Sequence, residues 1–100
     1  MVKHIVMFSF KDENKKANLL KAKAMLEGLL ESVPTLKNIE VGVNFAKEDR
    51  AMDLSLYSEF EDESALKSYA LHPAHLEVVK FIKSVASASK VVDYNTILKN

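Results

Sequence analysis

Residues Val2–Phe10 read VKHIVMFSF, and this alternating stretch sets the fold class of the chain. A period of two over nine residues is typical of a β-strand, because successive side chains of a strand point to opposite faces. One face carries Val2, His4, Val6, Phe8 and Phe10, and the other carries Lys3, Ile5, Met7 and Ser9. The first face is apolar apart from its histidine, so we expect it to pack against helices.

Three further strands are predicted by the same kind of pattern. They cover Leu36–Phe45, Met52–Phe60 and Val91–Leu98. In the first of them, Val43 and Phe45 share the apolar face. The polar residues 47–50 separate the first two of these strands and are typical of a turn.

Helices are predicted between the strands. Apolar residues recur at spacings of three and four from Leu19 to Val33, which indicates an amphipathic helix that Pro34 ends. A second helix is expected over Asp62–Ala70, because acidic residues at its start interact favourably with the helix dipole. A third is expected over Pro73–Ala86, since proline is well tolerated in the first turn of a helix.

The order strand, helix, strand, strand, helix, strand predicts an α+β domain of the ferredoxin-like βαββαβ type. Such a domain has a four-stranded antiparallel sheet with its helices on one face. The first and third strands are then central, and the fourth lies beside the first. No linker or repeat interrupts the chain, so residues 1–100 are expected to form a single domain.

The second face of the sheet predicts a partner. It carries an apolar group made of Ile5, Met7, Tyr57, Val92 and Tyr94. A contiguous apolar group on a small domain favours an interface, and we expect a homodimer in which two sheets pack face to face. The alternative is a set of scattered apolar residues, which are common on protein surfaces.

The composition excludes several other partners. Fourteen basic residues balance fourteen acidic ones, so the basic surplus that usually accompanies nucleic-acid binding is missing. No apolar run is long enough to span a membrane, and no cleavable signal is recognised. Cysteine is absent, which excludes a thiolate nucleophile or thiolate metal site. We therefore expect a cytoplasmic protein that binds neither nucleic acid nor membranes.

Two histidines and a tyrosine surround the second proline in the stretch Tyr69-Ala-Leu-His72-Pro73-Ala-His75. Together with Val2-Lys-His-Ile-Val6, Phe60-Glu61 and Val91-Val-Asp-Tyr94, this stretch resembles the stress-responsive A/B-barrel domain family, whose members form dimeric α+β barrels. The resemblance covers nearly the whole chain. It implies a homodimeric barrel built from two ferredoxin-like sheets.

The resemblance also implies a set of site residues. Most bacterial members of the family have no assigned activity, whereas plant members include a polyketide cyclase that closes a ring by aldol condensation. Its site tyrosine and histidine match Tyr69 and His75, and a first-strand histidine and a last-strand aspartate match His4 and Asp93.

The strand faces independently place these groups near one pocket between sheet and helices. Val6, Phe8 and Leu56 are expected to line that pocket. Asp93 can approach His4 or His75, and a carboxylate bonded to one ring nitrogen leaves the other free as a base. The hypothesis for chemistry makes His75 the base, Asp93 its orienter and Tyr69 a donor to the developing oxyanion.

Each of these residues also has a purely structural interpretation. Tyr69 can be a core aromatic, His75 an interior histidine satisfied by Asp93, and His4 a partner of a neighbouring strand. His72 is expected to shape the helix junction rather than to act in chemistry. Two histidines separated by Pro73 are a poor metal signal, and no glycine-rich phosphate loop exists, so no metal or cofactor is predicted.

The sequence thus predicts a dimeric protein of unassigned role that binds a small organic molecule. The alternative is a cofactor-free cyclase, lyase or isomerase that uses a Tyr–His pair. A monooxygenase, as in other dimeric α+β-barrel families, rests on the shared fold alone.

Overall fold

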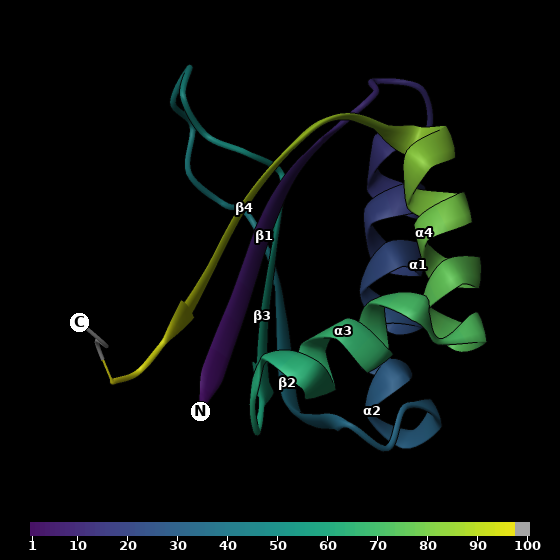
Figure 1. The fold of residues 1–100 in the computed structure, drawn as a ribbon. Coiled ribbons are helices and arrows are strands. Elements are labelled where there is room, and N and C mark those ends of the chain that lie inside the picture. The colour runs from purple at the N-terminus through teal and green to yellow at the C-terminus, as the bar shows by residue number, and fades with distance from the viewer. Residues whose placement is uncertain (98–100) are drawn as a thin grey trace.

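The computed structural model describes residues 1–97, and its centre is one antiparallel sheet. The strands are β1 (Val2–Phe10), β2 (Leu36–Val43), β3 (Leu54–Phe60) and β4 (Ala86–Asn95). Their order across the sheet is β2-β3-β1-β4 (Figure 1), so the predicted ferredoxin-like topology, with β1 and β3 central, is confirmed.

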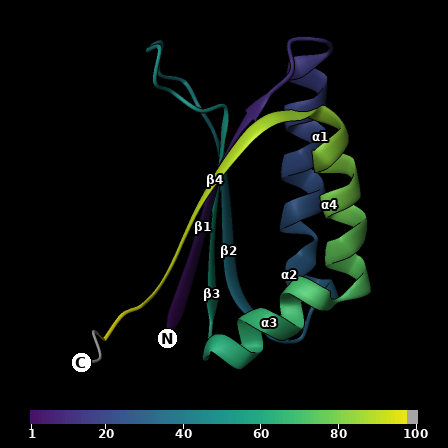
Figure 2. The ribbon, with the colours of Figure 1, turned by 45° about the horizontal axis from the view of Figure 1, so that its top comes forward.

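All the helices cover one face of this sheet, as Figures 1 and 2 show. They are α1 (Lys15–Glu27), α2 (Leu29–Ser32), α3 (Glu63–Leu71) and α4 (Pro73–Val85). The single helix predicted up to Val33 is divided at Gly28 into α1 and α2. Val33, the residue before Pro34, is already extended, as steric contact with a proline ring requires.

The core lies between the inner face of the sheet and the helices. The apolar alternation of β1 and β3 supplies Val2, Phe10, Leu54 and Phe60, all at most 3% exposed. The helices cover them with Leu19, Ala22, Leu26, Leu29, Val78 and Ile82. Burying one large apolar side chain contributes about 1.5–3 kcal/mol, so this face accounts for most of the driving force for folding.

The junction between α3 and α4 is built by side-chain caps. Asp62 accepts a hydrogen bond from the Ala65 amide at 2.8 Å and starts α3. His72 ends α3 and caps α4, because its Nδ1 accepts a hydrogen bond from the Ala74 amide at 3.0 Å. Pro73 occupies the first position of α4. The structural role predicted for His72 is confirmed.

Three predicted strand boundaries were wrong. β3 begins at Leu54, two residues after the predicted start at Met52. β4 begins at Ala86, five residues before Val91, because the chain passes from helix to extended backbone without a loop and pairs at once with the end of β1. Leu98, the predicted end of this strand, lies outside the described residues. Phe45 was expected on the apolar face of β2, but the β2–β3 pairing stops at Val43 and Phe45 is 96% exposed.

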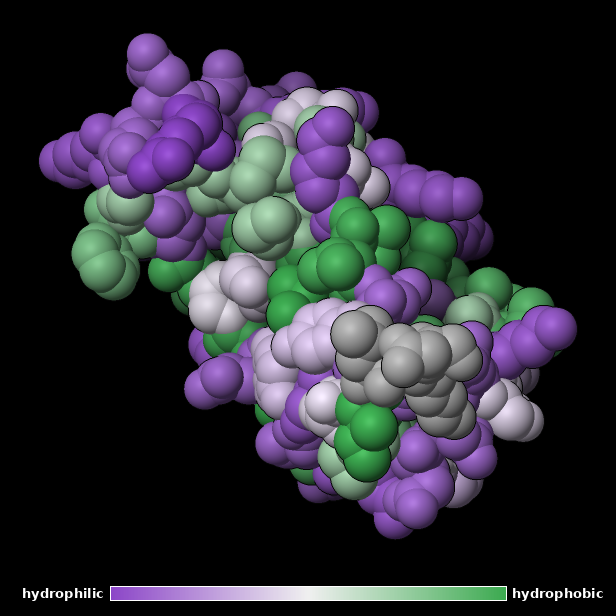
Figure 3. All heavy atoms as spheres, turned by 60° about the vertical axis from the view of Figure 1, so that its left-hand side comes forward, coloured by the Kyte–Doolittle hydropathy of each residue, from purple (hydrophilic) through white to green (hydrophobic). Residues whose placement is uncertain are grey.

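The sheet face away from the helices carries the outer-face patch of Ile5, Met7, Tyr57, Val92 and Tyr94. Strand register places Ile5 directly between Tyr57 and Val92, so the predicted contiguity across β3, β1 and β4 is confirmed. Met7, Val92 and Tyr94 remain 41–51% exposed in the single chain. Figure 3 shows hydrophobic residues gathered on this side of the molecule.

Candidate ligand site

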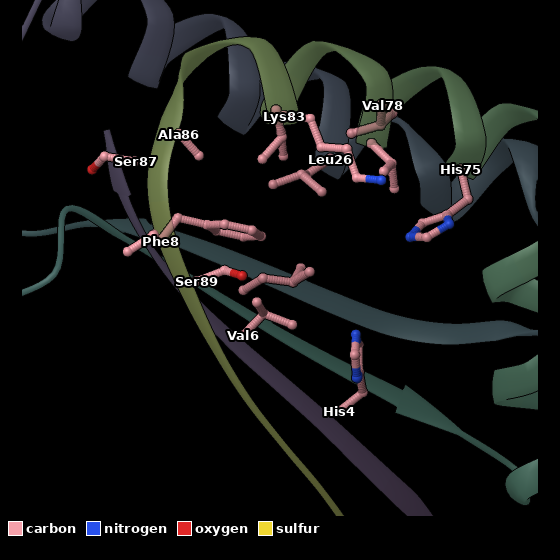
Figure 4. A pocket seen from close by; sticks show the side chains of 14 residues that line it. His4, Val6, Phe8, Leu26, His75, Val78, Lys83, Ala86, Ser87 and Ser89 are labelled. Atoms are coloured by element: carbon pink, nitrogen blue, oxygen red, sulfur yellow. The ribbon is translucent and has the colours of Figure 1, made fainter. Parts of the chain in front are cut away.

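A cavity of about 350 Å³ lies between α4 and the inner face of the sheet. Most of its wall is apolar and comes from the strand faces and helix stripes that build the core. This part of the wall is formed by Val6, Phe8, Leu26, Leu56, Val78 and Ile82. Small residues at the start of β4, including Ser87 and Ser89, border the other side (Figure 4). The cavity is large enough for a small organic molecule.

His4 enters the cavity from β1. It lies directly opposite Asp93 on β4, and its Nδ1 is hydrogen-bonded to the Asp93 carboxylate. Because an ionised carboxylate only accepts hydrogen bonds, Nδ1 carries a proton, and in the neutral ring Nε2 is then an acceptor. The Ser58 hydroxyl donates to the backbone oxygen of His4 at 3.1 Å and holds the strand beneath it. Figure 4 shows the His4 ring pointing into the cavity.

His75 enters the same cavity from the first turn of α4. Its Nδ1 lies 3.1 Å from the carbonyl oxygen of Ala70. A carbonyl can only accept, so this Nδ1 also carries the proton, and Nε2 faces the cavity. Burial lowers the pKa of His75, and nearby His4 and His72 lower it further, against the opposing effect of the Ala70 carbonyl. The imidazole is therefore held neutral, with an unprotonated nitrogen exposed to a ligand.

Tyr69 lies behind His75 rather than in the cavity wall. Its ring is 1% exposed and packs 4.4 Å from the His75 ring, 4.9 Å from Phe60 and 6.3 Å from His4, measured between ring centroids. Its buried hydroxyl has no hydrogen-bond partner among residues 1–97. Burial raises the pKa of Tyr69 to about 12, so the phenol stays protonated and remains a donor.

The structure thus brings together most of the predicted site. His4, His75, Val6, Phe8 and Leu56 all line the cavity. Of the two partners expected for Asp93, the structure gives His4, so the hypothesis that Asp93 orients His75 was wrong. Inward-facing residues on paired strands meet directly, so the β1–β4 register gives Asp93 to His4, while His75 bonds to Ala70.

Lys83 and the serines of early β4 were missed by the sequence reasoning. Ser87 and Ser89 lie in the part of β4 that the prediction left out. Lys83 follows His75 by eight residues, about two helical turns, so both residues lie on the same side of α4. This spacing could have identified Lys83 as a lining residue from the sequence. Within residues 1–97, no group of three or more histidine, aspartate or glutamate side chains gathers closely enough to hold a metal ion.

The family assignment follows from comparison of the whole chain. The model of the stress responsive A/B barrel domain matches residues 2–96. The chain belongs to this family. A family member from Mesorhizobium loti has the ferredoxin-like fold described above. A search of curated protein sequences finds no match to this chain.

Solved structures agree with this assignment. A dimeric protein of unknown function from Bacteroides fragilis is 33% identical, with 93% of both chains covered and a TM-score of 0.84. A protein from Arabidopsis thaliana is 24% identical over 100% of this chain and 99% of its own, with a TM-score of 0.86. A hydroxynitrile lyase from Passiflora edulis is 22% identical over 98% and 96%, with a TM-score of 0.84. The last two similarities show the fold only.

None of the helices in residues 1–97 has both the length and the apolar character needed to cross a bilayer.

Proposed function

We propose that this protein binds a small, mostly apolar organic molecule in the cavity between α4 and the sheet. The observation that carries the proposal is the pair of histidines in a largely apolar wall. His4 and His75 reach the cavity from different elements, and each has its Nδ1 bonded elsewhere and its Nε2 left for a ligand.

The chemistry of the wall restricts the ligand. Two unprotonated ring nitrogens accept hydrogen bonds, so the ligand should present a hydroxyl, enol or similar donor at this end. The apolar remainder of the wall favours a hydrocarbon or aromatic body. The polar groups would set orientation, and the apolar area would supply most of the affinity.

Binding can be tested with the fluorescent apolar probe N-phenyl-1-naphthylamine. We expect saturable fluorescence enhancement with the wild-type chain. Ser89→Trp should abolish it, because Ser89 lies opposite the inward-facing Phe8 and a bulky side chain there fills the cavity. The matched control is Lys16→Trp on the exposed surface of α1, which should leave binding unchanged. Equal binding by wild type and Ser89→Trp would reject the cavity as the binding site.

A second candidate function is proton-transfer catalysis, and the His4–Asp93 pair is the observation that favours it. Asp93 fixes the tautomer of His4 and would stabilise the imidazolium formed when Nε2 removes a proton next to a carbonyl. In this proposal His4 is the base and His75 is the second proton-transfer group. Tyr69 remains a candidate oxyanion donor, and its use requires its buried hydroxyl to reach the ligand.

This chemistry has a direct assay. Small aryl ketones should exchange their α-hydrogens for deuterium in D₂O faster with the protein than without it, as followed by proton NMR. His4→Gln should reduce the protein-dependent rate roughly 10²-fold or more, within the usual range for a general base. Unchanged exchange in His4→Gln would remove His4 from the mechanism while leaving the binding function intact.

We also propose that the chain forms a homodimer through the outer-face patch. The patch is contiguous, exposed and apolar in the single chain, and the relative from Bacteroides fragilis is described as dimeric. Face-to-face packing of two such sheets would leave the cavity, which lies on the opposite side of the sheet, available to a ligand.

A further inference from the structure

The cavity has a distinct electrostatic end at Lys83. This residue belongs to the last turn of α4 and lines the cavity together with His75, which lies two turns earlier. Among the lining residues it is the only lysine, and none of the others is an arginine, aspartate or glutamate. Figure 4 shows the Lys83 side chain extending along the cavity in the direction of His75.

The ammonium of Lys83 is available for a ligand. None of the ion pairs among residues 1–97 includes Lys83. A lysine in the last turn of a helix also interacts favourably with the helix dipole, which is the plain structural explanation for its place. That explanation accounts for a lysine at this position of the helix. It does not account for the direction of the side chain, which extends over an apolar cavity.

The charged groups around the cavity are unevenly distributed. The carboxylate of Asp93 lies behind His4, so an anionic ligand group is disfavoured at the histidine end. Lys83 leaves α4 eight residues after His75, a rise of roughly 12 Å at 1.5 Å per residue, and its side chain extends back along the cavity toward His75. A ligand in the cavity would therefore meet one cation, the two histidine rings and a largely apolar wall.

We propose that the ligand of this cavity is an amphipathic monoanion, such as a carboxylic acid, bound with its charged group at Lys83 and its apolar body against the apolar wall. This inference rests on the proposed binding function and narrows the ligand class.

The test uses displacement of bound N-phenyl-1-naphthylamine by decanoate and by decan-1-ol at about pH 8, where decanoate is ionised and decan-1-ol is neutral. The two competitors have the same chain and differ in charge. Wild type, Lys83→Gln and Lys80→Gln are compared. Lys80 is an exposed lysine of the same helix that does not line the cavity. Lys80→Gln removes the same charge as Lys83→Gln and is therefore the matched control.

Decanoate should bind about fivefold more weakly to Lys83→Gln than to wild type, as expected for a charge pair at a partly exposed mouth. Its affinity for Lys80→Gln, and the affinity of decan-1-ol for all three proteins, should stay the same. An equal loss of decanoate affinity in both variants, or no loss in Lys83→Gln, would overturn the assignment of Lys83 while leaving the cavity as a binding site. Failure of the wild-type protein to bind N-phenyl-1-naphthylamine would overturn the binding function itself and this inference with it.

Discussion

His4 on β1 and Asp93 on β4 face each other across the two strands and are joined by a hydrogen bond from the His4 ring to the carboxylate. His75, on the opposite wall, has its ring fixed by a different partner, the backbone oxygen of Ala70. Two unrelated local structures therefore place the same tautomer of histidine at one cavity. This convergence adds two histidine rings to a cavity wall that is largely apolar.

Replacing Asp93 with alanine should release the tautomer of His4. In the wild-type protein at about pH 8, long-range ¹⁵N–¹H correlation spectra should show His4 protonated at Nδ1, whereas Asp93→Ala should give a mixture of the two neutral forms. The cost in stability should be about 1 kcal/mol or less, because the Asp93 side chain is 45% exposed. The His75 signals serve as the internal control. An unchanged His4 tautomer would show that another group fixes the ring.

The neutral state of His75 should appear in the pH dependence of stability. Burial lowers its pKa in the folded protein below the ordinary value of about 6.5, so the unfolded chain binds more protons in the interval between the two values. The free energy of unfolding should therefore be highest above the unfolded pKa and fall as the pH drops toward the folded one. This contribution is missing in His75→Gln.

Urea unfolding at about pH 8 and pH 5 measures this contribution, with the unfolded histidine titrating between them. The stability difference between wild type and His75→Gln should be larger at the higher pH. A difference that grows on acidification would mean that the folded state favours the protonated ring.

The sequence predicted the faces of the sheet well because alternation is a local property with a strong physical cause. His4, Val6 and Phe8 share a face by the period of the strand, and their place in the cavity follows from the rule that helices cover that face. Partners were harder to predict. The bond from His4 to Asp93 depends on the register of two strands 89 residues apart, and periodicity within each strand carries no information on register.

The missed start of β4 has a similar cause. Residues 86–89 read ASAS, so they have no apolar alternation, and pairing with β1 rather than side-chain burial makes them a strand. Phe45 is the converse case, since it continues an alternation that the backbone does not follow. In both places tertiary pairing overrides the local pattern, and the border of the cavity at Ser87 and Ser89 depends on the pairing of β4 with β1.

Tyr69→Phe tests whether the buried hydroxyl has an unrecognised partner. The ring contributes packing against His75 and Phe60, and the hydroxyl is buried without a bond among residues 1–97. An unsatisfied buried polar group costs roughly 1–3 kcal/mol, so its removal should leave stability unchanged or raise it by about 1 kcal/mol in urea unfolding. Tyr69→Ala, which also removes the ring, should cost about 3–5 kcal/mol. A loss of 1 kcal/mol or more in Tyr69→Phe, on the same scale, would show that the hydroxyl donates a hydrogen bond in the folded protein.

Val92→Glu is predicted to separate the homodimer into monomers. Val92 pairs with Ile5 at the centre of the outer-face patch, and a carboxylate placed there would lose its water on association, at a cost of roughly 2 kcal/mol or more. The matched control is Leu20→Glu on α1, where the native side chain is 59% exposed, compared with 51% for Val92. Light scattering coupled to size-exclusion chromatography should give a dimer for wild type and Leu20→Glu and a monomer for Val92→Glu. If Leu20→Glu dissociates the protein and Val92→Glu does not, the interface lies on the helical side, and the ligand cavity would then border the partner.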